Sequence, residues 1–373
     1  MRAFFLDLFA ATRVIYAHRP GHRPWARINI GRNFPRTVLY VIVALLVVAN
    51  TVNLAADIAA MGESLQLVIG GPAHAYAILF GVICLLLQLF LSYRRYVRYL
   101  KWLTLALLSY VLVLFTIRIP WATVIAHTVT PHFALTADYL TVVVAVFGTT
   151  ISPYLFFWQA AQEVEELNAD PAAGALAHAP EGAAEHLRRI KIDTYLGMGF
   201  SNLVALCIML ATAATLNAAG VTEIRTSAQA AEALRPLAGD LTFLLFALGI
   251  IGTGLIAVPV LAGSAAYAVT EIFEWRRGLD LKLLDAREFY AFIGLATLGG
   301  VALNFSPIDP IRALFWSAVL NGVIAVPIMV VMMLLADDPK VMGRFTIKRQ
   351  LKALGWLATG TMAAAVAAMF ATW

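Results

Sequence analysis

The sequence predicts an all-α protein that crosses a membrane many times. Of its 373 residues 61% are hydrophobic and 13% are charged, whereas soluble domains average about 45–50% apolar and about 25% charged residues. Apolar runs recur along the chain at about 20 residues, the length that a helix needs to cross a hydrocarbon core about 30 Å thick. None of these runs alternates between apolar and polar residues, so we expect helices, which satisfy their own backbone hydrogen bonds in lipid.

Nine full spans and one partial span are expected. The partial span covers residues 3–17. The full spans cover roughly residues 37–61, 74–92, 100–118, 137–160, 194–217, 241–271, 287–305, 311–336 and 351–371. We divide the chain accordingly into a basic segment with the partial helix (1–36), a first group of spans (37–160), a linker (161–193) and a second group of spans (194–373).

The basic residues predict the orientation. Of the 27 Lys and Arg residues, 23 lie in alternate loops that would share one side of the membrane, and only Arg118, Arg225, Arg235 and Arg312 lie on the other. Lys and Arg are concentrated in cytoplasmic loops. We therefore expect a multi-pass protein of the plasma (inner) membrane with the 161–193 linker in the cytoplasm and the C-terminus outside. The net charge of +5 is then explained by the basic residues of the cytoplasmic loops, and no nucleic-acid partner is expected.

The sequence argues against several classes of site. Cys84 and Cys207 both lie in apolar runs, which supports neither a disulfide framework nor a zinc cluster. We find no HExxH motif, no Ser/His/Asp set and no pair of catalytic carboxylates at membrane depth, so we do not expect an enzyme.

One face of the 37–61 span is polar. Asn50, Asn53 and Asp57 are three and four residues apart and therefore lie on the same side of a helix. A carboxylate within a span costs about 2.5–3.5 kcal/mol on insertion scales, so Asp57 should face the bundle interior or a hydrated cavity. These three residues predict either an ion or proton pathway or a structural hydrogen-bond network between helices.

The 137–160 span contains a candidate break. Pro153 lacks an N–H group and clashes with the preceding turn, and the hydroxyls of Thr149 and Ser152 can bond backbone groups that are freed there. Discontinuous helices of this kind form ion sites in secondary transporters, although a plain proline kink is the alternative. Tyr154 and Gln159 follow the break.

Two other spans contain a proline without such polar neighbours. We expect only simple kinks at Pro259 and Pro327. In the span that contains Pro327, Ser317 and Asn321 lie four residues apart and are candidates to line the same cavity.

From about residue 30 onward the chain resembles the natural resistance-associated macrophage protein (Nramp) family of divalent metal transporters. The matching stretches are Val48 to Gly62, Gly148 to Gln159 with Glu163 to Glu166, Gly249 to Gly254, Val258 to Ser264, and Ser317 to Gly322. The resemblance implies an inverted-repeat (LeuT-like) transporter fold, in which 37–160 holds spans three to six and 194–373 holds spans seven to eleven. It also implies that a divalent metal ion is the transported substrate and that no cofactor is resident.

The resemblance places the metal site at the break. The family has a Met-Pro-His pattern there, and the matching residues are Ser152, Pro153 and Tyr154, with Thr149 at the position that supplies a backbone carbonyl. A hydroxyl in place of a thioether favours Mg²⁺ or Mn²⁺. The implied pathway includes Asn50, Asn53, Asp57, Tyr154, Gln159, Ser317 and Asn321. Of the family's acidic pair in the third helix, Asp57 matches the first member and Ala60 stands at the second, which leaves proton coupling open.

The family's first helix, which supplies a metal-binding carboxylate, has no counterpart in this sequence. We therefore expect an N-terminally truncated form of the fold, with residues 3–17 corresponding to the end of the second helix. Two alternatives to a metal transporter follow: a non-transporting paralogue, and a permease for small organic solutes on the same architecture. The oligomeric state is left open.

Overall fold

The structure is a computed structural model that describes residues 36–90, 102–130, 133–169, 180–221, 223–224, 226–279, 281–306, 309–342 and 346–373. Regular structure in these ranges is entirely helical. The predicted partial span at 3–17 and the basic segment, apart from Arg36, lie outside the described residues.

Seven of the predicted spans are helices long and apolar enough to cross a membrane. They are α3 (Arg36–Ile69), α4 (Ala73–Phe90), α8 (Ala137–Thr150) together with α9 (Pro153–Ala169), α10 (Pro180–Thr212), α13 (Thr242–Phe273), α15 (Pro310–Asp337) and α17 (Arg349–Thr372). The all-α membrane fold that the composition predicts is therefore confirmed.

The other two predicted spans take shorter forms. The 100–118 span is made of η1 (Leu103–Leu107) and α6 (Leu108–Thr116), and the chain then bends by 112° into α7 (Trp121–Val129). The 287–305 span is α14 (Arg287–Leu303), whose 17 residues rise only about 25 Å at 1.5 Å per residue. Among the described residues the expected nine continuous crossings are thus seven, or eight if the bent pair counts as one.

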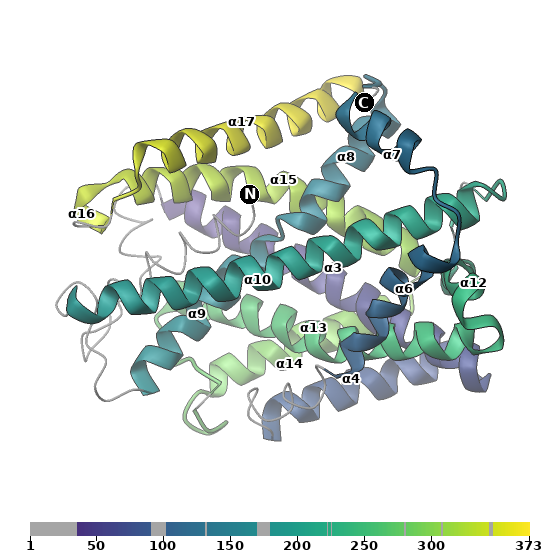
Figure 1. Cartoon of the computed structure of the whole chain (residues 1–373). Coiled ribbons are helices and arrows are strands. Elements are labelled where there is room, and N and C mark those ends of the chain that lie inside the picture. The colour runs from purple at the N-terminus through teal and green to yellow at the C-terminus, as the bar shows by residue number, and fades with distance from the viewer. Residues whose placement is uncertain are drawn as a thin grey trace.

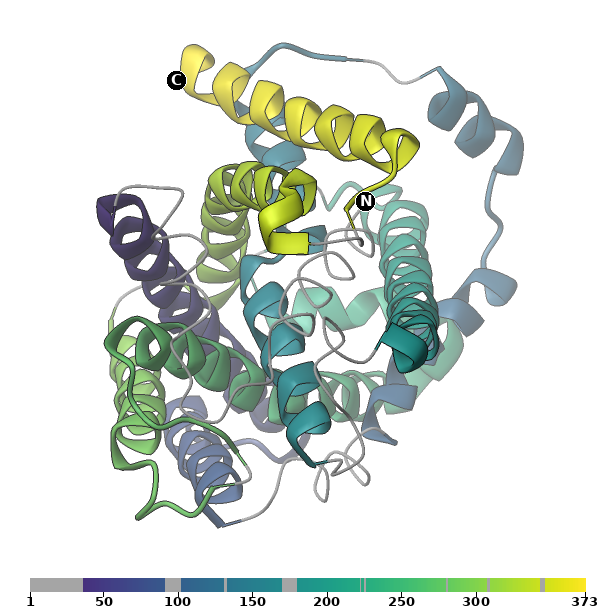
Figure 2. The same cartoon turned by 90° about the vertical axis from the view of Figure 1, so that its left-hand side faces the viewer.

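Helix α3 is the axis of the packing. It contacts α4, α13, α14 and α15, while α17 lies at the edge of the bundle against α8 and α15 (Figures 1 and 2). Two buried clusters meet along α3. The half of α3 that contains Leu46 packs with α9, α15 and α17, and the half that contains Leu54 and Ile58 packs with α4, α13 and α14.

Helix α10 flanks the bundle (Figure 2), and most side chains of its part from Arg188 onward are exposed. Leu196, Phe200 and Leu203 are among its exposed apolar residues. Such a face suits contact with lipid, where apolar exposure has no cost.

The linker between the two groups of spans is largely helical. Residues 161–169 continue α9, and residues 180–193 form the first part of α10. Arg189 of α10 forms an ion pair with Glu163 of α9 at 3.0 Å. These bounds extend the two helices into the predicted 161–193 linker.

The short helices between α10 and α13 follow local sequence rules. After η2 (Ala213–Asn217), α11 (Ser227–Ala231) is capped by Thr226, whose hydroxyl accepts a hydrogen bond from the Gln229 backbone N–H. The elements that follow are η3 (Glu232–Leu234), α12 (Arg235–Ala238) and η4 (Gly239–Leu241), and α16 (Pro339–Met342) follows α15.

Candidate functional site

The predicted break in the fourth span is present. Helix α8 ends at Thr150, Ile151 and Ser152 are outside helical geometry, and α9 begins at Pro153. In a continuous helix, the carbonyl of Thr149 would accept from the N–H four residues on, and that residue is Pro153, which has none. The Thr149 carbonyl is therefore freed by the sequence itself.

The Ser152 hydroxyl takes the place of the missing donor. Its Oγ lies 3.0 Å from the Thr149 carbonyl oxygen and 3.1 Å from that of Gly148, and the side chain is buried. One hydroxyl proton serves both carbonyls, so the lone pairs of Oγ remain available. The two predicted metal ligands, the Ser152 hydroxyl and the Thr149 carbonyl, are thus adjacent.

The threonine hydroxyls at the break form hydrogen bonds within their own helix. Thr149 Oγ1 donates to the Ala145 carbonyl at 3.0 Å, and Thr150 Oγ1 donates to the Val146 carbonyl at 2.6 Å. It is therefore the backbone of Thr149 that can face a ligand. The carboxyl end of α8 also carries the negative end of its helix dipole, which favours a cation.

Helix α15 packs directly against the end of α8. A Cβ atom on Gly148 would collide with the Ala318 carbonyl oxygen and would lie 2.5 Å from the Gly322 nitrogen, so only glycine permits this approach. Asn321 precedes Gly322 and is buried, and its side-chain oxygen has no hydrogen-bond donor among the described residues. Ser317, one turn earlier, donates to the Leu314 carbonyl at 2.8 Å.

The polar face of α3 begins beside the break. Leu46 and Ala49 pack in the same cluster as Ile151, which places the neighbouring Asn50 near that level. Asn50 Nδ2 donates to the Leu261 carbonyl of α13 at 3.0 Å, while its buried oxygen Oδ1 has no donor within the described chain. Two buried amide oxygens, of Asn50 and Asn321, are therefore left for a ligand.

The rest of that face lies farther along α3. Asn53 and Asp57 are half-buried. Asp57 is seven residues beyond Asn50, a rise of about 10 Å along the helix toward the end predicted to be outside. The structure therefore brings Ser152, Thr149, Asn321 and Asn50 toward one level and sets Asp57 along a path that leads away from it.

Tyr154 and Gln159 have other partners. The Tyr154 carbonyl accepts a hydrogen bond from Ser264 Oγ of α13 at 2.8 Å, and its ring packs between the two core clusters. Gln159 Nε2 donates to Thr194 Oγ1 of α10 at 2.9 Å, and Thr194 donates to the Ile190 carbonyl. Gln159 thus holds α9 against α10, about two turns from the break.

The sequence did not reveal a contact at the far end of α9. The Tyr267 hydroxyl of α13 donates to the Glu165 carboxylate, which also accepts the Leu279 N–H at 3.1 Å. Burial lowers the pKa of nearby Arg277, with Tyr267 opposing the shift. No local pattern links Glu165 with Tyr267, because the two residues are 102 positions apart in the sequence.

The donors at the break are neutral oxygens. Within the described ranges, no group of three or more His, Cys, Asp or Glu residues could hold a metal ion. Carbonyl, hydroxyl and amide oxygens are hard ligands, which suit Mg²⁺, Ca²⁺ and Mn²⁺ better than soft metals.

Comparisons with known proteins identify the family that the chain matches. The family profile described as "Natural resistance-associated macrophage protein-like" matches residues 27–372. A curated relative, the "Divalent metal cation transporter MntH" of Clostridium acetobutylicum, is 24% identical over 252 residues. That match covers 67% of this chain but only about half, 53%, of the relative.

Solved structures show the same fold. Two single-residue mutants of the Eremococcus coleocola manganese transporter each align with a TM-score of 0.71 at 17% identity, over 98% of this chain and 76% of theirs. The same transporter in complex with an aromatic bis-isothiourea substituted compound aligns with a TM-score of 0.70.

Proposed function

Because the chain belongs to the Nramp family, we propose that it is a transporter of divalent metal cations in the plasma (inner) membrane. The single observation that carries this proposal is the break between α8 and α9, where Pro153 leaves the Thr149 carbonyl without a backbone donor and Ser152 places a hydroxyl beside it. A half-helix end with a freed carbonyl is the usual ion-binding element of secondary transporters.

The ion would be cargo and would be held by oxygen. The Ser152 hydroxyl and the Thr149 carbonyl would be its first contacts, and the buried oxygens of Asn50 and Asn321 would complete the site from α3 and α15. Such a set favours Mn²⁺ or Mg²⁺. Asn53, Asp57 and Ser317 would line the route to and from the break.

Transport would proceed by alternating access between the two sides of the membrane. The linker 161–193 would lie in the cytoplasm and the C-terminus outside, as the basic residues predict. Opening toward the cytoplasm would require α9 to separate from its neighbours, and the Gln159–Thr194 and Glu165–Tyr267 hydrogen bonds are the contacts that such a movement would break.

Uptake by the full chain in proteoliposomes tests the proposal. We expect saturable Mn²⁺ uptake that excess Mg²⁺ reduces, and uptake about tenfold slower in Ser152→Ala, the scale expected for loss of one cation-binding oxygen. The matched control is Thr150→Ala, which removes a hydroxyl that bonds within α8. Absence of both flux and binding of Mn²⁺ and Mg²⁺ would support a non-transporting paralogue, and uptake of an amino acid alone would support a solute permease.

A further inference from the structure

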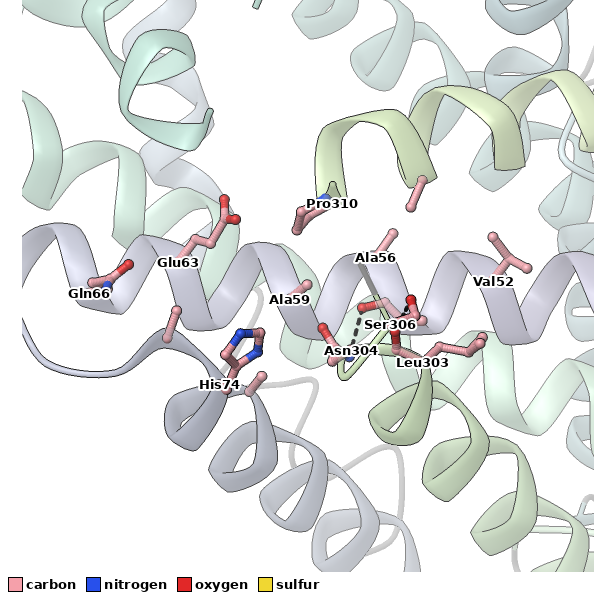
Figure 3. Close-up of a pocket in the computed structure, with 14 residues that line it drawn as sticks. Val52, Ala56, Ala59, Glu63, Gln66, His74, Leu303, Asn304, Ser306 and Pro310 are labelled. Carbon is pink, nitrogen blue, oxygen red and sulfur yellow. Dashed lines mark hydrogen bonds between the residues drawn. The ribbon is translucent and has the colours of Figure 1, made fainter. Parts of the chain in front are cut away.

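A pocket lies at the other end of α3, on the side of the molecule predicted to be outside (Figure 3). It is a cavity of about 210 Å³ between α3, the first turn of α4, the turn after α14 and the first turns of α15. Its polar side chains are Glu63, Gln66, His74, Asn304 and Ser306, and its walls are otherwise mainly alanine, valine and leucine.

Three of these polar side chains donate hydrogen bonds to backbone carbonyls. Asn304 Nδ2 donates to the Ala55 carbonyl at 3.2 Å, and Ser306 donates to the Leu303 carbonyl at 2.6 Å (Figure 3). Asn304 Nδ2 also donates to the Gly300 carbonyl at 2.9 Å. Gln66 Nε2 donates to the carbonyl of Gly71 at 2.6 Å, in the turn between α3 and α4 where Gly70 and Gly71 have positive φ. Their oxygen atoms therefore remain as acceptors.

Glu63 adds a carboxylate to this set of acceptors. One of its oxygens accepts a hydrogen bond from Ser227 of α11 at 2.5 Å. A carboxylate retains further lone pairs when it accepts a single hydrogen bond. The pocket is thus rich in acceptors and carries one negative side chain.

The helix dipoles at this pocket largely offset one another. Two helices, α3 and α14, end near it, and two, α4 and α15, begin near it. Carboxyl ends favour cations and amino ends favour anions. The side chains therefore decide which charge the pocket prefers, and the Glu63 carboxylate makes that a cation.

The pocket is separate from the α8–α9 break. The α3 residues that line it form a face turned by about 140° from that of Asn50, Asn53 and Asp57 at 3.6 residues per turn. These lining residues are Val52, Ala55, Ala56, Ala59, Glu63 and Gln66. Asn50 faces α13, where it bonds the Leu261 carbonyl.

We propose that this pocket binds a hydrated divalent cation through the water molecules of its first shell. The cavity of about 210 Å³ far exceeds the roughly 10–15 Å³ that one bound water requires in the same measure, so it has room for an ion with six waters. Coordinated waters are strong donors, and the pocket offers acceptors to them. Mg²⁺ in particular gives up its waters reluctantly and is commonly held by only one or two carboxylates.

The inference deepens the proposed function, because the same class of ion would be collected at the outer face before it reaches the break. The two sites differ in chemistry. At the pocket the ion keeps its water shell, whereas at the break protein oxygens replace part of that shell.

Mn²⁺ titration of the full chain in lipid nanodiscs, followed by electron paramagnetic resonance, tests this proposal. We expect a weaker class of bound Mn²⁺ that hexaamminecobalt(III) displaces, since this ion has the size of a hexahydrate and does not exchange its ligands. Glu63→Gln should weaken this class at least about tenfold, because one charge contact is lost. Gln retains an oxygen that can accept from Ser227.

Two further variants distinguish binding in the pocket from non-specific attraction of cations to negative charge on this side of the protein. Asp240→Asn removes an exposed charge in η4, on the same predicted side, and should leave the weaker class unchanged. Ala59→Leu fills the pocket while it retains Glu63, and should abolish that class. Thermal unfolding of each variant verifies that it is folded.

Equal weakening by Glu63→Gln and Asp240→Asn, or a failure of hexaamminecobalt(III) to compete, would overturn the proposal. Its failure is distinct from that of the proposed function. Uptake with no weaker class refutes the pocket alone, and a weaker class without uptake refutes transport alone.

Discussion

Two prolines in membrane spans have opposite consequences in this molecule. At Pro153 the helix breaks, so that α8 and α9 are separate elements, whereas α13 runs without interruption from Thr242 to Phe273 through Pro259. Each proline removes one backbone donor, at the expense of the Thr149 carbonyl in the first case and the Leu255 carbonyl in the second.

The difference lies in the neighbours. Ser152 supplies a hydroxyl to the Thr149 and Gly148 carbonyls, which stabilises the end of α8. Pro259 is flanked by Val258, Val260 and Leu261, all apolar and buried. A proline therefore permits a break, and a side-chain donor beside it makes the broken form stable in a low-dielectric setting.

The largest effect is expected when each proline is replaced by alanine in turn. Pro153→Ala supplies an N–H donor at residue 153 for the Thr149 carbonyl and removes a proline that costs a helix interior about 3 kcal/mol, so α8 and α9 should join. We expect Mn²⁺ uptake by this variant to fall to that of empty liposomes. Pro259→Ala, the matched control, should still transport. Transport at the unsubstituted rate by Pro153→Ala would show that the break is not the ion site.

A smaller effect should follow from changing the ligand while the break is retained. Ser152→Met replaces a hard hydroxyl with a soft thioether, so the ratio of Cd²⁺ to Mg²⁺ uptake should rise by about tenfold. Thr150→Met is the control, because its hydroxyl bonds within α8. An unchanged ratio in Ser152→Met, measured by competition in proteoliposomes, would exclude Ser152 from the ion's first shell.

The smallest expected effects are changes in stability when the two buried amide side chains, Asn321 and Asn50, are replaced. Asn321→Leu removes an oxygen that has no donor among the described residues, so the free energy of unfolding should stay equal or rise by about 1 kcal/mol while uptake falls. Asn50→Leu also loses the bond to the Leu261 carbonyl and should be destabilised by about 1 kcal/mol. Thermal unfolding in detergent distinguishes the two. Loss of stability in Asn321→Leu would assign that oxygen a structural role.

Much of the fold could be predicted from the sequence, because a span must be apolar and must satisfy its own backbone hydrogen bonds in lipid. Apolar length predicted seven of the crossings, and the polar residues beside Pro153 marked the candidate break. The kinks expected at Pro259 and Pro327 remain predictions, and both prolines lie within helices that the structure shows as single elements. Local spacing could not predict the bend between α6 and α7, nor the early end of α14, because both 100–118 and 287–305 are apolar enough to be read as complete spans.

The sequence alone determined that the chain is helical, where seven of its spans lie and at which proline a span could break, because each of these depends on neighbours within a few residues. Only the tertiary structure decided which polar groups serve the break. It gave Gln159 a partner on α10 and left the oxygens of Asn50 and Asn321 without one among the described residues. It also joined Glu165 to Tyr267 and gathered the pocket around Glu63 from four helices. Such contacts join residues that are far apart in the chain. A hydrogen bond between them requires that they lie close together in space, and periodicity along one helix does not predict that distance.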